Sequence, residues 1–169
     1  MKLFDFSKPD ATETWRAIDD RVMGGISQSE LLAVTEQSIT AAAFRGSLSL
    51  ENNGGFCSVR SPVNASIPAA KEHLWIDCRN TDKWGEKLYS LNLRMSDGFD
   101  GISYRSSFTP KAAFARFEFT TVEFAPVFRG RPVPDAPSLK ISKVQQAGLM
   151  ISDAQKGPFE LIVRAIGVN

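Results

Sequence analysis

The chain has 169 residues, of which 43% are hydrophobic, and its 20 Lys and Arg are balanced by 19 Asp and Glu. This length fits one domain covering residues 1–169, and the apolar content is typical of a globular protein. Nucleic-acid binding depends on a marked basic excess, so this balance predicts no nucleic-acid partner.

The N-terminal segment 1–9 begins with apolar residues, but Asp5 interrupts them before a signal-peptide core is reached. Further along, no stretch approaches the roughly 18 apolar residues that a membrane span needs. We therefore expect a cytoplasmic protein without membrane insertion.

Alternating polar and apolar residues, the period of a half-buried strand, recur along the chain. Tyr89 and Leu91, for example, alternate with Ser90 and Asn92. A last segment, 159–166, is apolar on both faces and predicts a central strand. The segments with strict alternation are 47–51, 73–78, 88–95, 102–108 and 115–119.

Turn chemistry separates these segments. The runs 53–55, 97–98 and 100–101 combine Asn or Asp with Gly, which supplies positive φ angles, and three prolines between 131 and 137 predict a loop. Short helical turns are expected only near 9–18 and 68–72. The spacing of the strands indicates an all-β fold, a jelly-roll β-sandwich with under about 15% helix.

The inventory of reactive residues argues against an enzyme. The single histidine, His73, lies in a predicted strand and is interpreted as a surface residue, and no P-loop or GxGxxG motif is present. Cys57 and Cys78 are isolated, so we expect free thiols, no tightly bound metal and no cofactor. A calcium site built only from carboxylate and carbonyl oxygens is the one exception that the sequence leaves open. The adjacent Asp19 and Asp20 point to opposite sides in extended chain. An enzyme whose carboxylates meet only in the fold is a remaining alternative.

Three segments mix glycine with charge to a degree that is unusual for scaffolding. The first, residues 19–29, reads DDRVMGGISQS; the second, 52–60, reads NNGGFCSVR; the third, 124–131, reads FAPVFRGR. Taken singly, each is as readily explained by turn chemistry and solvated charge.

In this order and spacing, together with Trp15 and the later GLMISD and GPF sequences, the three segments resemble the complex I intermediate-associated protein 30 family. The resemblance runs from about Phe4 to Ile166 and fits the bacterial stand-alone type. It implies a galactose-binding-like jelly roll and a link to assembly factors, since mitochondrial members help to build respiratory complex I. The chain departs from the family pattern at Phe114, Thr120 and Arg164.

Two main functions follow from these observations. The resemblance implies a non-catalytic protein-binding module, an assembly or chaperone-like factor whose partners include subunits of a respiratory complex. The implied fold also suggests a carbohydrate-binding module, by analogy alone.

We expect the binding residues of the three segments to lie together on one side of the sandwich, with Asp20 paired to an arginine. Arginine and exposed aromatic residues suit a protein interface. The alternative is that an Asp–Arg pair only ties the loops together. The candidate binding residues are Asp20, Arg21, Met23, Gly24, Gly25, Ser27, Asn53, Gly55, Phe56, Arg60, Arg129, Gly130 and Arg131.

Overall fold

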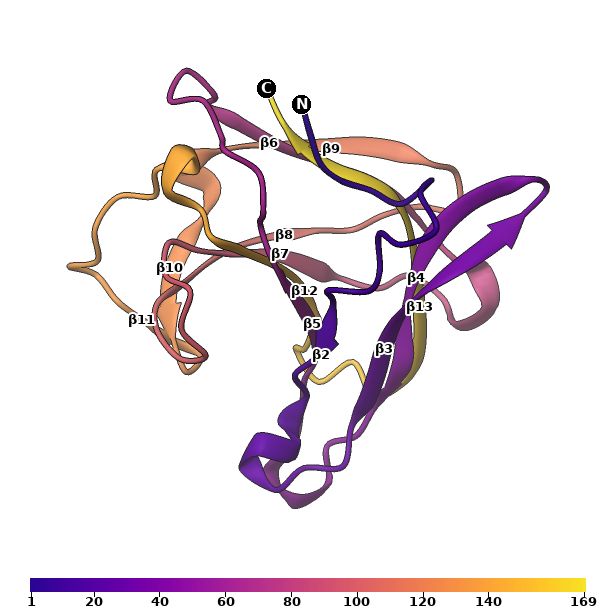
Figure 1. Ribbon diagram of the computed structural model, residues 1–169. Helices are drawn as coiled ribbons and strands as arrows, with labels where there is room; N and C mark the ends of the chain where they lie inside the picture. The colour runs from indigo at the N-terminus through magenta and orange to yellow at the C-terminus, as the bar shows by residue number, and fades with distance from the viewer.

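The computed structural model describes all residues from 1 to 169 and consists of two antiparallel sheets packed face to face (Figure 1). The six-stranded sheet has the order β3-β4-β13-β6-β9, with β1 paired to β13. Its strands are β1 (Lys2–Asp5), β3 (Gln28–Glu36), β4 (Ile39–Leu48), β6 (His73–Asn80), β9 (Ala115–Thr120) and β13 (Gly157–Val168).

The seven-stranded sheet has the order β11-β10-β8-β7-β12-β5-β2. Strand β2, which comes early in the chain, closes one edge by pairing with β5, and the β10–β11 hairpin closes the other. Its strands are β2 (Arg16–Ala17), β5 (Cys57–Pro62), β7 (Tyr89–Arg94), β8 (Ser103–Phe108), β10 (Ala125–Phe128), β11 (Arg131–Pro132) and β12 (Gln146–Ile151).

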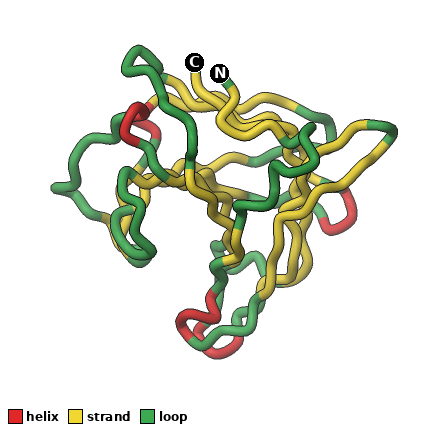
Figure 2. The backbone as a smooth tube through the Cα atoms, viewed as in Figure 1, coloured by secondary structure: helices red, strands yellow, loops and turns green.

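Helical structure is confined to single 3-10 turns, drawn red in Figure 2. There is no α-helix, which confirms the expected scarcity of helix. The turns are η1 (Asp20–Met23), η2 (Glu51–Asn53), η3 (Asp82–Trp84), η4 (Thr121–Glu123) and η5 (Ile141–Lys143).

The core lies between the sheets and follows the predicted alternation. Tyr89, Leu91 and Leu93 of β7 are buried, while Asn92 and Arg94 turn to the outer face. Strand β13 is central, as its apolar character predicted, because it pairs with both β4 and β6. Each large side chain removed from water contributes roughly 1.5–3 kcal/mol, so this shared core dominates the stability of the sandwich.

Two predictions about local structure, for residues 47–51 and for Gly98, need correction, and one hairpin was missed. The alternating segment 47–51 is not a strand throughout, because β4 ends at Leu48 and η2 begins at Glu51. The β3–β4 hairpin was not predicted, because its turn at Gln37 and Ser38 adopts positive φ without glycine. Gly98 does not adopt positive φ, whereas Asn53, Gly55 and Gly101 do.

Candidate functional site

The first two predicted segments are joined by the buried carboxylate of Asp20. Its Oδ1 accepts a hydrogen bond from the backbone N–H of Ser27 at 2.9 Å, and its Oδ2 accepts from the N–H of Gly55 at 2.8 Å and from the Ser27 hydroxyl. The residue is fully buried. It forms no ion pair, so the expected pairing of Asp20 with an arginine is wrong: backbone and hydroxyl donors already occupy both oxygens.

The environment of Asp20 keeps this carboxylate ionised. Burial raises its pKa, but the hydrogen bonds from the Ser27 hydroxyl and from the backbone of Gly55 and Ser27 outweigh burial, so the pKa lies below its usual value. A carboxylate that only accepts hydrogen bonds has no proton to donate at neutral pH. Asp20 therefore acts as an anchor for two loops and not as a general acid.

Asp19 makes a second set of links beside it. Its Oδ1 accepts from the Ser29 hydroxyl at 2.6 Å and from the backbone N–H of Ser58 at 3.1 Å, and its Oδ2 accepts from the N–H of Ser29 at 3.0 Å. The two aspartates thus fasten residues 18–29 to residues 49–58. We call these two stretches the loop clasp.

Glycines complete the loop clasp because there is no room for a side chain. A Cβ on Gly54 would lie 2.5 Å from Asp20 Oδ2, and one on Gly25 would overlap the same carboxylate. Gly24 instead has open space but a φ of +87°, which favours glycine. The charged and glycine positions that make the motif conspicuous are therefore largely explained by local structure.

Between these anchors the loop clasp exposes apolar side chains. Val22 and Met23 are 62% and 60% exposed, and Ile26 and Leu50 are also exposed. Arg21 is exposed beside them and forms no ion pair. A rigid loop thus carries an apolar tip with one free cation, at the bottom of the view in Figure 1.

A pocket of about 330 Å³ adjoins the loop clasp. The lining includes the aromatic residue Phe99, which is 66% exposed, and the polar residues Arg21 and Gln28. The remaining lining residues are Ala17, Ile18, Asp19, Val22 and Ser29.

The loop that carries Phe99 connects the third predicted segment to the other two. Arg60 of β5 donates from Nη2 to the Phe99 carbonyl at 3.0 Å, and Arg129 donates from Nη2 to Asp100 Oδ2 at 2.7 Å. Gly130 has a φ of +77° in the β10–β11 turn, and Arg131 follows it, exposed, in β11. The structure therefore brings all three segments to one side of the sandwich, linked by residues 99–100. Asn53 and Phe56 belong to the clasp through backbone conformation and not through side-chain bonds.

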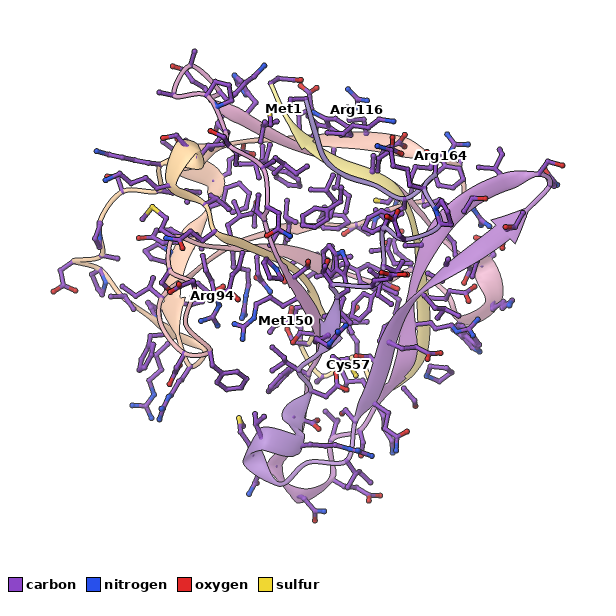
Figure 3. All side chains as sticks on the ribbon, viewed as in Figure 1. Met1, Cys57, Arg94, Arg116, Met150 and Arg164 are labelled. Atoms are coloured by element: carbon purple, nitrogen blue, oxygen red, sulfur yellow. The ribbon has the colours of Figure 1, made fainter.

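Sequence reasoning missed several residues of this side, namely Phe99, Arg94, Arg105 and the exposed Val22 and Ile26. A usable signal existed for Phe99, an aromatic residue between two Asp–Gly turns. Arg94 and Arg105 lie on the polar faces of two correctly predicted strands, and their closeness appears only once the strands pair. Arg94 of β7 and Met150 of β12 lie on neighbouring strands of the seven-stranded sheet (Figure 3).

Two other groups weighed from the sequence, His73 and Cys78, lie away from this side, whereas Cys57 lies within the loop clasp. His73 is exposed at the start of β6, and Cys57 and Cys78 are free and buried in different sheets. Burial raises the pKa of the Cys57 thiol to about 12. No group of three or more His, Cys, Asp or Glu side chains is placed to hold a metal ion. No helix has the length and apolar character needed to cross a membrane.

A second and larger pocket, of about 610 Å³, lies on the outer face of the six-stranded sheet. Phe114 and Arg164, two of the positions that depart from the family pattern, both line it. The Arg164 guanidinium lies 3.6 Å from the centre of the Phe114 ring. Phe114 also packs against the small apolar cluster of Ala41, Ala43 and Ile162.

Solved structures with the same fold include carbohydrate-binding modules. The family 11 module of a cellulosomal cellulase of Clostridium thermocellum superposes with a TM-score of 0.73 at 13% identity, covering 99% of this chain and 92% of that one. The same type of module in complex with a β-1,3-1,4-mixed-linked tetrasaccharide gives 0.68 at 12% identity, over 92% and 88% of the two chains. These likenesses establish the fold as a two-sheet sandwich of the galactose-binding-like kind.

Sequence comparison gives the family. An uncharacterized protein of Schizosaccharomyces pombe is 31% identical over 170 aligned positions, which cover 91% of this chain and 77% of that protein. The family model described as complex I intermediate-associated protein 30 matches residues 4–163, which include the loop clasp, Arg60 and the β10–β11 turn. This chain belongs to the complex I intermediate-associated protein 30 family.

Proposed function

We propose that this chain is a non-catalytic protein-binding module that acts as an assembly or chaperone-like factor for a multisubunit complex, with respiratory complex subunits as partners. Family membership supports a role of the assembly-factor type. We further propose that it acts in the cytoplasm.

The observation that carries this proposal is the contrast between buried anchor residues and exposed apolar residues in the loop clasp. Asp20 and Ser27 are buried and hydrogen-bonded to each other. Val22, Met23 and Ile26, which lie between them in the sequence, are exposed to solvent. Exposed apolar residues gathered on a rigid loop are typical of a surface that a partner covers. Methionine adapts to partners of different shape, and the neighbouring Arg21 adds a residue type that is enriched in interfaces.

The test is a comparison of two variants in affinity purification from native extract, with bound proteins identified by mass spectrometry. Val22→Ser combined with Met23→Ser removes the apolar tip. The matched control is Val122→Ser, because Val122 is 89% exposed but lies in η4, away from the loop clasp. We expect the wild type and the control to retain subunits of one complex and the double variant to lose them. Equal recovery by all three proteins would contradict the proposal.

A carbohydrate-binding module is the second candidate, favoured by the pocket beside the clasp. An exposed aromatic residue, Phe99, lines this pocket together with the polar residues Arg21 and Gln28, and a family 11 module of the same fold is described in complex with a tetrasaccharide. A glycan array separates the two functions. Binding that is lost in Phe99→Ala but kept in Met23→Ser, whose side chain does not line the pocket, would favour the carbohydrate.

A further inference from the structure

The outer face of the seven-stranded sheet carries a row of polar residues that crosses four strands. Arg60 of β5 pairs with Gly148 of β12, Gly148 with Asn92 of β7, and Asn92 with Arg105 of β8. Arg94 lies two residues beyond Asn92 on the same strand and therefore on the same face. Three guanidinium groups thus share one face of the sheet.

These arginines have few partners within the molecule. Arg60 and Arg94 both donate to the Phe99 carbonyl, at 3.0 and 3.4 Å, Arg94 also donates to the Gly101 carbonyl at 3.2 Å, and Arg105 donates only to Asn92 Oδ1 at 3.2 Å. A guanidinium has N–H donors on all three nitrogens, so most donors of the row are free. None of the three arginines forms an ion pair.

The nearby acidic residues do not supply the missing partners. Asp100, whose charge acts on Arg60 and Arg94, forms its ion pair with Arg129 instead. The charge of Asp153 acts on Arg105 without an ion pair. Burial lowers the pKa of Arg60 to about 10, with a further lowering by the charge of Arg94, and burial also lowers the pKa of Arg94 and Arg105. The cluster is thus partly desolvated, and no carboxylate forms an ion pair with it.

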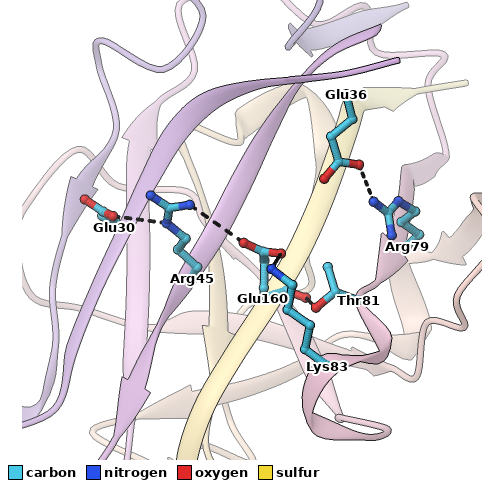
Figure 4. A network of polar contacts seen from close by, with 7 residues as sticks. All are labelled: Glu30, Glu36, Arg45, Arg79, Thr81, Lys83 and Glu160. Carbon is cyan, nitrogen blue, oxygen red and sulfur yellow. Dashed lines mark hydrogen bonds and ion pairs between the residues drawn. The ribbon is translucent and has the colours of Figure 1, made fainter. Parts of the chain in front are cut away.

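On the outer face of the six-stranded sheet, two arginines have carboxylate partners that neutralise their charge (Figure 4). There Arg45 lies between the carboxylates of Glu30 and Glu160, and Arg79 is paired with Glu36. Arg45 and Arg79 are therefore matched by carboxylates, and the other two arginines of that sheet, Arg116 and Arg164, lie over the rings of Trp75 and Phe114. Arg60, Arg94 and Arg105 of the seven-stranded sheet have no carboxylate partner.

We propose that the outer face of the seven-stranded sheet binds an extended acidic segment of the partner protein, with carboxylates on alternate residues meeting Arg60, Arg94 and Arg105. This inference rests on the proposed protein-binding function and specifies the chemistry of the partner. A carboxylate accepts two parallel hydrogen bonds from one guanidinium, which the free donors of this row allow.

The spacing of the row fits an extended chain laid across the strands. Neighbouring strands are about 4.8 Å apart, so three steps from β5 to β8 span about 14 Å. Alternate residues of an extended peptide are about 6.8 Å apart, so the first and third of three alternate acidic residues match the distance from Arg60 to Arg105. Arg94 lies about 6.8 Å to one side of this line, and its long side chain is the partner of the middle acidic residue. The exposed ring of Phe99, whose centre lies 5.3 Å from the Arg60 guanidinium, offers an apolar contact at one end.

The experiment measures binding of a fluorescein-labelled peptide of about ten residues with glutamates at three alternate positions, by fluorescence anisotropy. A peptide with glutamine at these positions is the matched ligand control. We expect the acidic peptide to bind at least about tenfold more tightly and to weaken with rising ionic strength, as charge pairing requires. Equal affinity for both peptides, or no binding of the acidic one, would overturn the proposal.

Variants locate the binding on the protein. Arg60→Gln and Arg105→Gln should each weaken the acidic peptide about fivefold or more, whereas Arg116→Gln, which removes the same charge from the other sheet, should leave the affinity within about twofold. Equal weakening by all three, or complete displacement by inorganic phosphate at matched ionic strength, would overturn the assignment to an acidic peptide. The purification experiment separates this inference from the proposed function. The inference is refuted, and the proposed function stands, when the double variant Arg60→Gln/Arg105→Gln retains the partner fully and the Val22/Met23 variant loses it.

Discussion

The loop clasp and the β10–β11 turn use the same residue types in opposite ways. In the loop clasp, Asp20 is fully buried and accepts hydrogen bonds from two loops. In the β10–β11 turn, Arg129 pairs with Asp100, and the two side chains are 73% and 50% exposed. The comparison teaches that glycine and charge in a motif do not by themselves mark a binding site, because burial decides whether a charge stabilises the fold or stays available to a partner.

The largest expected effect is that of Asp20→Asn. The amide has nearly the shape of the carboxylate, but its NH2 group replaces one of the two accepting oxygens and faces the N–H of either Ser27 or Gly55, so one buried donor loses its acceptor. We expect the free energy of unfolding to fall by roughly 3 kcal/mol, measured by urea denaturation. Asp135→Asn, in an exposed loop, is the control and should change it by less than about 0.5 kcal/mol. A loss below about 1 kcal/mol for Asp20→Asn would mean that the clasp is not a stabilising element.

Two glycine variants separate the two reasons for glycine in the loop clasp, which are lack of space for a side chain and a positive φ. Gly54→Ala places a Cβ against Asp20 Oδ2 and should cost about 2–3 kcal/mol. Gly24→Ala has open space around it and only a strained φ, so it should cost about 1 kcal/mol. Both are compared by thermal unfolding. The reverse order of the two losses would show that backbone conformation, and not the packing on Asp20, sets the requirement for glycine.

Acidification gives a third test of the buried Asp20 carboxylate. The pKa of Asp20 is lower in the folded protein than its ordinary value of 3.8. The stability it contributes is therefore fully present above about pH 4 and is lost as pH falls through the folded pKa. We expect the melting temperature of the wild type to drop more steeply below pH 4 than that of Asp20→Asn. Parallel pH profiles for the two proteins would contradict this role.

The smallest expected effect belongs to the β10–β11 turn. Arg129→Ala removes one partner of an exposed ion pair, and such pairs contribute about 0–1 kcal/mol. We expect the melting temperature to stay within about 2 °C of the wild type. A double-mutant cycle with Asp100→Ala measures the coupling directly, and a coupling energy above about 1.5 kcal/mol would place this turn with the clasp as a structural element.

Much of the fold could be predicted from local patterns. The alternation in 88–95 places Tyr89 and Leu91 in the core, and the apolar run 159–166 becomes the central strand β13. Local patterns failed where a residue with low strand propensity or an unusual turn intervened. Strand β4 contains Ala41, Ala42 and Ala43, and the turn before it uses positive φ at Gln37 and Ser38.

The candidate site was also predicted only in part. We expected the three segments to gather on one side because each mixes glycine with charge, and the structure connects them through residues 99–100. The partner of Asp20 was wrongly predicted, because sequence gives the residue types able to pair with a carboxylate but not the backbone N–H groups that fold around it. Ser27 and Gly55 supply these donors only because the two loops meet.

By itself, the sequence determined the all-β class, the alternation that fills the core, and membership in the complex I intermediate-associated protein 30 family. These features depend on residues close together in the chain or on their order along it. Only the tertiary structure decided that Asp19 and Asp20 are loop anchors and that Arg60, Arg94 and Arg105 share one face without carboxylate partners. The physical reason is that burial and charge pairing are properties of strands that are distant in sequence and adjacent only after β5, β12, β7 and β8 have paired.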